Sequence, residues 1–390
     1  MADISKNTAT VYVTREVTEA LAVEPTNGSQ AVSVTSDGFE MNGEKALVER
    51  NNMTSSISKA LPRVGIKTSS VTLTVEAKAN SVAGVTPEAG LLFEACLGAT
   101  RSNTNSITTI TTTNLTTIPV SAITGLAVGD VVMFKDSNGY HITPLTAVAA
   151  NGTNDDTVTC LIPFAVAPAS NTAIEKSTSF YGANSGHPSL TVTTYLEDAL
   201  KMQSAGCRVA SLSLDGFETG GIASFNFGLN GTGYDESVAA SGLTASFSGA
   251  TPPLVLEACV YKDGTAIPVT ALSWSVENTL AQKLSTCAAN GILGQKITQR
   301  VVSGSFTPYM DTTSVALFDD FDANTQFSIC GFLSNPGASA GQKKEVIGFY
   351  LPVCIITAAP HSDADGLMQY NLEFSTGPDA AGSQIYITFS

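Results

Sequence analysis

The sequence contains the same β-rich pattern twice, and this repeat constrains the possible folds more than any single motif. Three segments of the first half return in the second half in the same order: 34–38 with 260–264, 91–95 with 317–321, and 221–227 with 366–372. The first two pairs are 226 positions apart, whereas the third pair is only 145 positions apart. The pattern therefore predicts a duplicated domain with one insertion in the first copy.

The offsets divide the chain into an expected set of segments. They are an N-terminal arm (1–30), a first domain in two parts (31–102 and 177–230), an inserted module (103–176), a linker (231–254) and a second domain (255–390). In the inserted module, turn signals such as Asn151-Gly152 separate short runs of Thr, Val and Ile, which is typical of a small β module. Because insertions are tolerated where the backbone is exposed, we expect this module to be self-contained.

Local patterns predict strands with one short helix in each copy. Val71 to Lys78 alternates apolar and polar residues, as a strand with one buried face does. Thr86-Pro87-Glu88 has the composition of a helix start, and Gly98 that of a helix end. The second copy has the same signals, with these expected cap and buried residues: Thr313 or Ser314, then Val315, Leu317, Phe318 and Phe321. The expected fold is all-β with short helices.

The net charge of −15 argues against a DNA-binding protein, which normally carries a basic face that contacts phosphates. Charged residues make up only 14% of the chain, and this suits a protein that hides much of its surface in an assembly. The first residues lack the apolar segment of a secretory signal. No run approaches the ~18 to 20 apolar residues of a membrane helix, so we expect no membrane span.

Residues typical of catalytic and metal sites are nearly absent. The chain has three histidines, far apart in turn-like contexts and expected at the surface: His141, His187 and His361. The seven cysteines contain no CxxC pair and are expected to be reduced core residues. The acidic cluster 319–322 does not match an EF-hand loop and is expected at a solvated helix end. The sequence therefore predicts no enzyme, no metal site and no cofactor.

Basic residues are concentrated in two matching segments, 49–70 and 277–300. These segments hold seven of the 19 Lys and Arg residues but only two acids, Glu49 and Glu277. Both are interpreted as polar loops. They are too long for tight hairpins and too apolar for loops that only connect two strands. The candidate contact residues are Arg50, Met53, Ile57, Lys59, Arg63 and Lys67, followed by Leu280, Lys283, Leu284, Lys296 and Arg300. They either dock on the acidic surface of a neighbouring subunit or are ordinary solvated residues.

Several stretches resemble the major tail (tail tube) proteins of long-tailed bacteriophages. The similar stretches are Val48 to Asn52, Val71 to Ala77, Pro87 to Gly98, and Gly186 to Phe227. The resemblance implies two tandem β-sandwich or barrel domains, each with a flanking helix, beside the inserted module. In that family, rings of six domains stack into a hollow tube with a largely negative lumen that conducts DNA. A long loop between two strands reaches the next ring.

The repeat changes what the resemblance implies for this chain. Because each chain supplies two domains, a ring of six domains needs three chains, which predicts a trimer with pseudo-six-fold symmetry. The implied partners are further copies of the chain, other tail proteins, and DNA that passes without specific binding. The implied location is the tail of a virion whose subunits are made in the host cytoplasm. The segments 49–70 and 277–300 would form the contacts between rings.

A capsid decoration protein or an adhesin with tandem β domains is the alternative. Such a surface-binding protein would share the acidic, Thr-rich composition but need not form tubes. No aromatic-rich loop indicates a carbohydrate site. Electron microscopy distinguishes the two classes, because only the first is expected to form rings or tubes.

Overall fold

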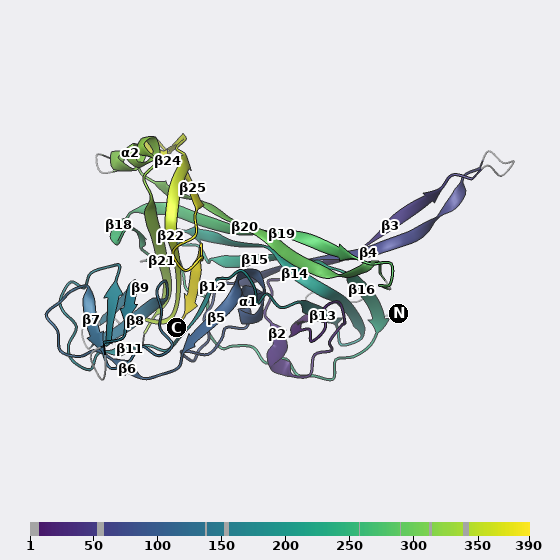
Figure 1. Ribbon diagram of the computed structural model, residues 1–390, viewed down its shortest axis with the longest axis horizontal. Coiled ribbons are helices and arrows are strands. Elements are labelled where there is room, and N and C mark those ends of the chain that lie inside the picture. The colour runs from purple at the N-terminus through teal and green to yellow at the C-terminus, as the bar shows by residue number, and fades with distance from the viewer. Residues whose placement is uncertain are drawn as a thin grey trace.

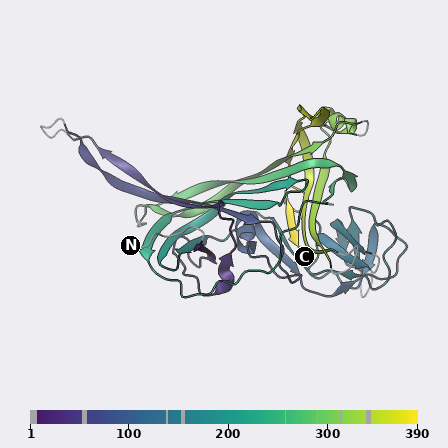
Figure 2. The same ribbon diagram turned by 180° about the vertical axis from the view of Figure 1, so that it is seen from behind.

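The computed structural model shows an elongated, nearly all-β molecule. It describes residues 8–52, 58–136, 139–151, 156–256, 258–288, 290–311, 314–337 and 343–390. A long hairpin projects at one end and a small separate sheet lies at the other, with the main sheet between them (Figure 1). The same arrangement is visible from behind in Figure 2. The prediction of an all-β fold with short helices is confirmed.

The first half of the chain forms an antiparallel arrangement around one long central strand. Its main strands are β1 (Thr10–Arg15), β3 (Phe39–Arg50), β4 (Ala60–Glu76), β13 (Leu190–Leu196), β14 (Leu200–Glu218), β15 (Ser224–Gly231) and β16 (Gly233–Val238). The central strand β14 pairs with β13, β15 and β16. The order continues from β15 to β4 and β3, and from β13 to β1. The short strand β2 (Ala31–Val32) follows a single 3-10 turn, Gly28–Gln30, and pairs with β1.

The second half repeats this order of strands. Its main strands are β17 (Val260–Lys262), β19 (Val269–Leu284), β20 (Ile292–Pro308), β21 (Phe327–Pro336), β22 (Lys343–Ala358), β25 (Leu372–Thr376) and β26 (Tyr386–Phe389). The central strand β22 pairs with β21, β25 and β26, as β14 does with β13, β15 and β16. The order continues from β25 to β20 and β19, and from β21 to β17. Shorter strands are β18 (Thr265–Ile267), β23 (His361–Ala364) and β24 (Leu367–Tyr370).

The cross-strand registers of the two halves also agree. Matching pairs are Leu214–Phe225 with His361–Tyr370, Leu73–Phe227 with Phe306–Leu372, and Val209–Leu229 with Ile356–Phe374. The alternate side chains of 225–229 and 370–374 that these pairs contain are buried in both halves. A shift of one residue would turn all of them away from the core, so burial specifies the register strongly.

The two halves are joined within one hydrogen-bonded sheet. Strand β14 also pairs with β19, from Ser211 opposite Glu277 to Glu218 opposite Ala271. The buried Trp274 on β19 continues the apolar core across this junction. The final strand β26 pairs with β12 (Ser177–Gly182), which in turn pairs with β5 (Gly98–Asn103). The last strand of the chain therefore lies in the core of its own subunit.

Residues 107–174 form a separate six-stranded sheet. Its strands are β6 (Ile107–Thr108), β7 (Thr117–Val120), β8 (Val131–Asp136), β9 (Gly139–Ala149), β10 (Asp156–Cys160) and β11 (Ala173–Ile174). The sheet has an apolar cluster of its own, in which the Phe134 and Phe164 rings lie 5.0 Å apart. Val131 on β8 instead packs against Tyr350 and Tyr386 of the second half. The inserted sheet is thus distinct, but it is seated on the second half.

Each half contains one short helix, α1 (Gly90–Leu97) or α2 (Val315–Ala323). Each helix ends at a residue in the left-handed conformation, Gly98 or Asn324. The predicted start of α1 at Thr86 is wrong, because the helix begins after Ala89. The Glu88 side chain, expected near that start, accepts a hydrogen bond from the Ser33 amide and lies 3.4 Å from Lys78 Nζ.

Helix α2 buries less than the sequence predicts. Leu317 is buried, but Val315 and Phe318 are 48% and 40% exposed. Ser314 is the N-cap residue without a side-chain capping bond, and Thr313 lies outside the described residues. The acidic residues 319–322 lie on the helix, as expected, and Asp320 forms an ion pair with Lys262 at 2.9 Å.

The structure also describes parts of the expected arm and linker. Within residues 1–30, β1 is built into the sheet, and Val11, Tyr12 and Val13 are buried. Within residues 231–254, β16 pairs with the start of β14, and residues 239–253 have no regular secondary structure. Apolar side chains in both segments favour this packing against the sheet, because burying them stabilises a strand more than a solvated arm.

Candidate assembly surfaces

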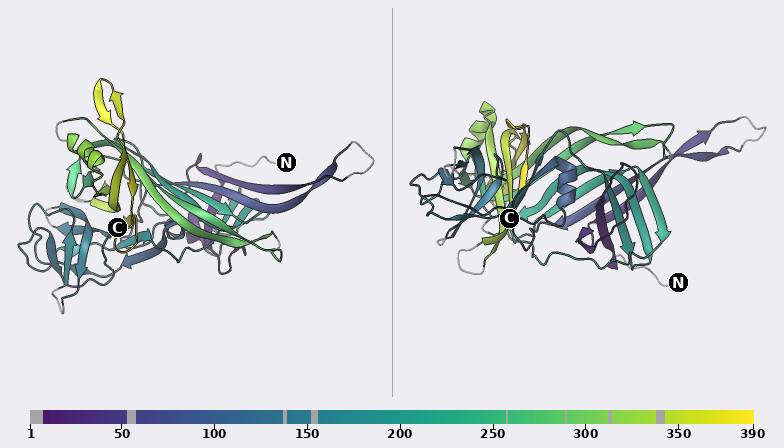
Figure 3. Two further views of the ribbon diagram at one scale, coloured as in Figure 1. Left: turned by 45° about the horizontal axis from the view of Figure 1, so that its top comes forward. Right: turned by 60° about the horizontal axis from the view of Figure 1, so that its bottom comes forward.

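The two basic segments lie in long hairpins and are not the loops that the sequence predicts. The described residues of 49–70 belong to the β3–β4 hairpin, and those of 277–300 belong to the β19–β20 hairpin. The β3–β4 hairpin extends clear of the rest of the molecule in both views of Figure 3. Most side chains near this tip are exposed on both faces of the hairpin. The sequence of these strands therefore lacks the apolar–polar alternation that identifies a half-buried strand.

The first hairpin presents free cations beside exposed apolar side chains. Arg50, Arg63 and Lys67 are exposed and have no ion-pair partner among the described residues, whereas Lys59 pairs with Glu49. The exposed apolar residues on these strands are Leu47, Val48, Leu61 and Val64. The candidate residues Met53 and Ile57 lie outside the described residues. An isolated two-stranded hairpin is at best marginally stable in water, so this end of the molecule is suited to a partner.

The second hairpin is held to the body of the subunit by Glu19. Its carboxylate lies 3.6 Å from Lys283 Nζ and accepts a hydrogen bond of 2.6 Å from the Gln295 amide. It also pairs with Arg208 on β14 at 3.0 Å. No local pattern of residues singles out Glu19, because its partners lie far away along the chain. Lys283 therefore has a partner inside the subunit.

The remaining candidates on the second hairpin differ in exposure. Lys296 is exposed and has no ion-pair partner among the described residues. Leu284 is 63% exposed near the tip, whereas Leu280 is half-buried. Both hairpins thus carry exposed cations and exposed apolar side chains together, a combination that suits contact with an acidic neighbour.

Arg300, the last candidate, is engaged inside the subunit at the junction of the halves. Its guanidinium donates hydrogen bonds to the carbonyls of Leu97 at 2.8 Å and Ala183 at 3.1 Å. Asn278, opposite Arg300 in the hairpin, donates to the carbonyl of Cys96 at 3.1 Å. The last carbonyls of a helix lack partners within it and carry partial negative charge, so both donors stabilise the end of α1. Burial lowers the pKa of Arg300.

Two histidines are half-buried, and their predicted surface position is wrong. His141 stacks on Phe164 with ring centroids 3.9 Å apart. His187 lies 3.2 Å from the carbonyl oxygen of Ala95. Burial lowers the pKa of both side chains. His361 is exposed on β23, as expected.

The cysteines are all free thiols, and five of the seven are buried. The buried ones are Cys96, Cys160, Cys207, Cys330 and Cys354. The prediction of a core position is wrong for Cys259 and Cys287, which are exposed. Burial raises the pKa of Cys96, Cys160 and Cys207 to about 12. The buried thiols are therefore protonated at neutral pH.

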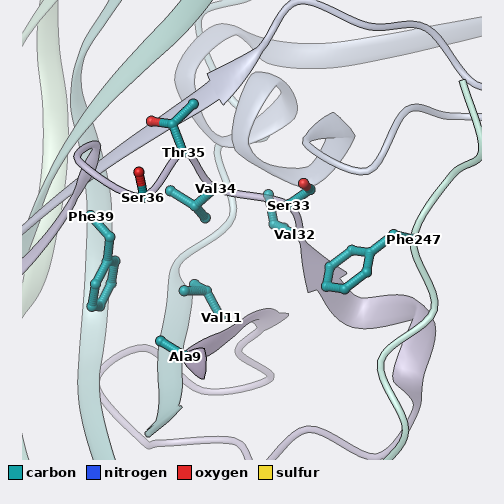
Figure 4. A pocket seen from close by; sticks show the side chains of 9 residues that line it. All are labelled: Ala9, Val11, Val32, Ser33, Val34, Thr35, Ser36, Phe39 and Phe247. Carbon is teal, nitrogen blue, oxygen red and sulfur yellow. The ribbon is translucent and has the colours of Figure 1, made fainter. Parts of the chain in front are cut away.

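The hollow shown in Figure 4 is lined by apolar and hydroxyl side chains. Its volume is about 190 Å³, and its lining consists of Ala9, Val11, Val32, Val34, Phe39 and Phe247 with Ser33, Thr35 and Ser36. None of these side chains is acidic, basic or a metal ligand of the His or Cys type. Across the described ranges, no three His, Cys, Asp or Glu residues converge as metal ligands. No helix there is long and apolar enough to span a membrane.

Comparison with known proteins gives one match of long extent. A family model described as phage tail tube protein matches residues 6–376, which include the first half, the inserted sheet, both hairpins and the second half up to the end of β25. No curated protein matches the chain. The match is to a structural family, in agreement with a molecule whose most conspicuous features are projecting strands.

Proposed function

The chain belongs to the phage tail tube protein family, and from this premise we propose that its copies assemble into stacked rings that conduct DNA. Membership makes it a structural subunit of the virion tail, where it assembles with itself and with other tail proteins. The observation that carries the proposal is the pair of long hairpins. Their ends extend beyond the sheet and expose apolar side chains beside cations that have no ion-pair partner among the described residues.

The two halves of one chain serve as two domains of a ring. Equal strand partners and equal registers support a duplication, with the first domain at 31–102 and 177–230 and the second at 255–390. Within the chain, β14 of one domain pairs with β19 of the other, so adjacent domains are joined edge to edge. Three chains then supply the six domains of a ring, and the ring is a trimer with pseudo-six-fold symmetry.

Contacts between rings come from the hairpin ends. Arg50, Arg63 and Lys296 approach an acidic neighbour, and Leu284 supplies apolar contact. Lys59 and Lys283 already have partners within the subunit and contribute less. One exposed ion pair adds only ~0.2–1 kcal/mol, but a ring repeats the contact several times. The net charge of −15 favours a lumen that DNA passes without binding.

Electron microscopy of the purified full chain tests this function. We expect rings or tubes with three chains per ring, and compact monomers at high concentration would contradict the proposal. The double variant Arg63→Glu, Lys296→Glu should remain folded but form shorter tubes. Lys135→Glu, Lys176→Glu makes the same change of charge away from the hairpins and should leave tube length unchanged. Tubes of normal length from the hairpin variant would show that the hairpins do not form the contacts between rings.

A further inference from the structure

The two central strands differ in one partner, and in the part of the chain that the structure describes this difference leaves two strand edges free. Strand β14 pairs with β13, β15, β16 and β19, whereas within the described part of the chain β22 pairs with only the counterparts of the first three. The counterpart of β19 in the first half is β3, and among the described residues β3 pairs with β4 alone. The edge of β3 in one copy of the chain could therefore supply the partner that the second central strand lacks in another copy.

The registers identify which residues of β3 and β4 would meet that second copy. Leu73 pairs with Phe39 in the first hairpin, and Phe306 pairs with Leu272 in the second. Six residues further toward each tip, Lys67 lies opposite Lys45, and Arg300 lies opposite Asn278. The Lys45–Lys67 pair is thus the counterpart of the Asn278–Arg300 pair, which binds the end of α1.

The Lys45–Lys67 pair has no counter-charge among the residues of its own subunit that the structure describes. Like charges directly opposite each other destabilise a pair of strands. Both lysines are exposed, and neither has an ion-pair partner in the part of the chain that the structure describes. The alternation along β3 places Lys45 on the same face as the buried Met41, which is the face that a neighbouring domain covers at Asn278.

The second half offers a matching surface at the end of α2. Asn324 ends α2 in the left-handed conformation, as Gly98 ends α1, so Asp322 corresponds to Cys96. Asp319 and Asp322 are exposed and have no ion-pair partner among the described residues. A helix C-terminus attracts cations, and these two carboxylates add to its negative charge.

We propose that Lys45 and Lys67 of one copy bind the C-terminal end of α2 in a second copy. Strand β3 adds to the free edge where β22 continues into β23, as β19 adds to β14 within the chain, because residues 211–218 of β14 correspond to residues 358–365. The contact between chains then repeats the contact between the halves, with two lysines and two aspartates in place of Asn278, Arg300 and the bare helix end. This proposal rests on the proposed self-assembly and names the surface that closes the ring.

Cysteine cross-linking of the full chain tests the contact. In a background of Cys259→Ser and Cys287→Ser, the pair Lys45→Cys, Asp322→Cys should form disulfide-linked dimers and trimers under mild oxidation. Asn278→Cys is the benchmark within one chain, because Asn278 Nδ2 lies 3.5 Å from Cys96 Sγ. Lys59→Cys, Asp322→Cys is the positional control and should stay unlinked, because Lys59 lies much nearer the hairpin tip.

Each outcome of the cross-linking has a separate meaning. Rings without linked chains would overturn this contact and leave the proposed tube intact. If the protein without these substitutions stays monomeric, both the proposed tube and the proposed contact are wrong. Linked chains with the Lys59 pair but not the Lys45 pair would also overturn the assigned register.

A charge exchange provides a second test that does not depend on cysteine geometry. Lys45→Glu, Lys67→Glu should abolish rings while circular dichroism shows a folded subunit. Adding Asp319→Lys and Asp322→Lys should restore them, which a merely structural defect in the hairpin would not allow. Rings that persist in the first variant, or a defect that the exchange does not repair, would overturn the contact.

Discussion

Cys207 and Cys354 occupy the same place in the two halves, each with its thiol against the backbone carbonyl three residues earlier. Cys207 Sγ lies 3.4 Å from the Ser204 oxygen, and Cys354 Sγ lies 3.7 Å from the Leu351 oxygen. Both cysteines are completely buried, each on the central strand of its half. The local contact therefore supports the same alignment of the halves as the strand registers do.

Thiol labelling should separate the buried cysteines from the exposed pair. Burial raises the pKa of Cys207 to about 12 and also raises that of Cys354, so at pH 8 neither forms much reactive thiolate. Only Cys259 and Cys287 should react quickly in the native protein. Mass spectrometry should count two adducts in buffer and seven in denaturant. Five or more rapid adducts in buffer would contradict the buried positions.

Phe93 on α1 should contribute far more to stability than Phe318 on α2. The Phe93 ring contacts four aromatic rings at centroid distances of 4.9 to 5.4 Å: Phe180, Phe225, Phe227 and Phe389. Phe93→Ala should lower the free energy of unfolding by ~3–5 kcal/mol, because it leaves a cavity in the core. Phe318→Ala is the matched control at 40% exposure, and its effect should be much smaller. Equal urea midpoints for the two variants would contradict this.

Removal of Arg101 should make the stability depend more strongly on pH. The Arg101 guanidinium donates hydrogen bonds of 3.0 and 2.8 Å to the two oxygens of Asp130, which is 1% exposed. Desolvation raises the pKa of Asp130 above 3.8 even with this partner present. Arg101→Met should therefore cost ~3–5 kcal/mol at pH 7, because it leaves the buried carboxylate unpaired.

The sign of this pH dependence follows from the raised pKa. The folded state then binds the proton more tightly than the unfolded state, so the stability of Arg101→Met should rise as the pH falls from 7 toward about 4. Urea unfolding at a series of pH values measures this. Arg101→Met, Asp130→Asn has no carboxyl group at the site and should lose the dependence. A flat profile for Arg101→Met would show that Asp130 finds another partner.

Deletion of residues 104–175 should leave the main sheet folded but less stable. Asn103 lies opposite Ser177 in the β5–β12 pair, so a short turn can join the cut ends. The deletion exposes Tyr350 and Tyr386, which the inserted sheet now covers. We expect a cooperative thermal transition at a lower midpoint. A transition that is no longer cooperative would show that the inserted sheet belongs to the core.

Much of the fold could be predicted where one face of a strand is buried. The alternation of Val71 to Lys78 predicted a strand whose first six residues form the end of β4, and matched alternation predicted that Phe227 and Leu372 share a register position. The hairpin ends escaped prediction, because strands that are exposed on both faces show no alternation. Arg300 looked like any other basic residue, because its acceptors, Leu97 and Ala183, lie more than a hundred residues away in the chain.

The sequence by itself determined the β-rich class, the order of the repeated elements and the absence of recognisable catalytic motifs. These follow from local periodicity and composition, which short stretches of chain already contain. Only the tertiary structure decided that β14 pairs with β19, that Glu19 holds the second hairpin, and that Lys45 and Lys67 lie without a counter-charge among the described residues. Such relationships arise when distant segments come together, and no local pattern records which edge or charge the folded chain leaves unpaired.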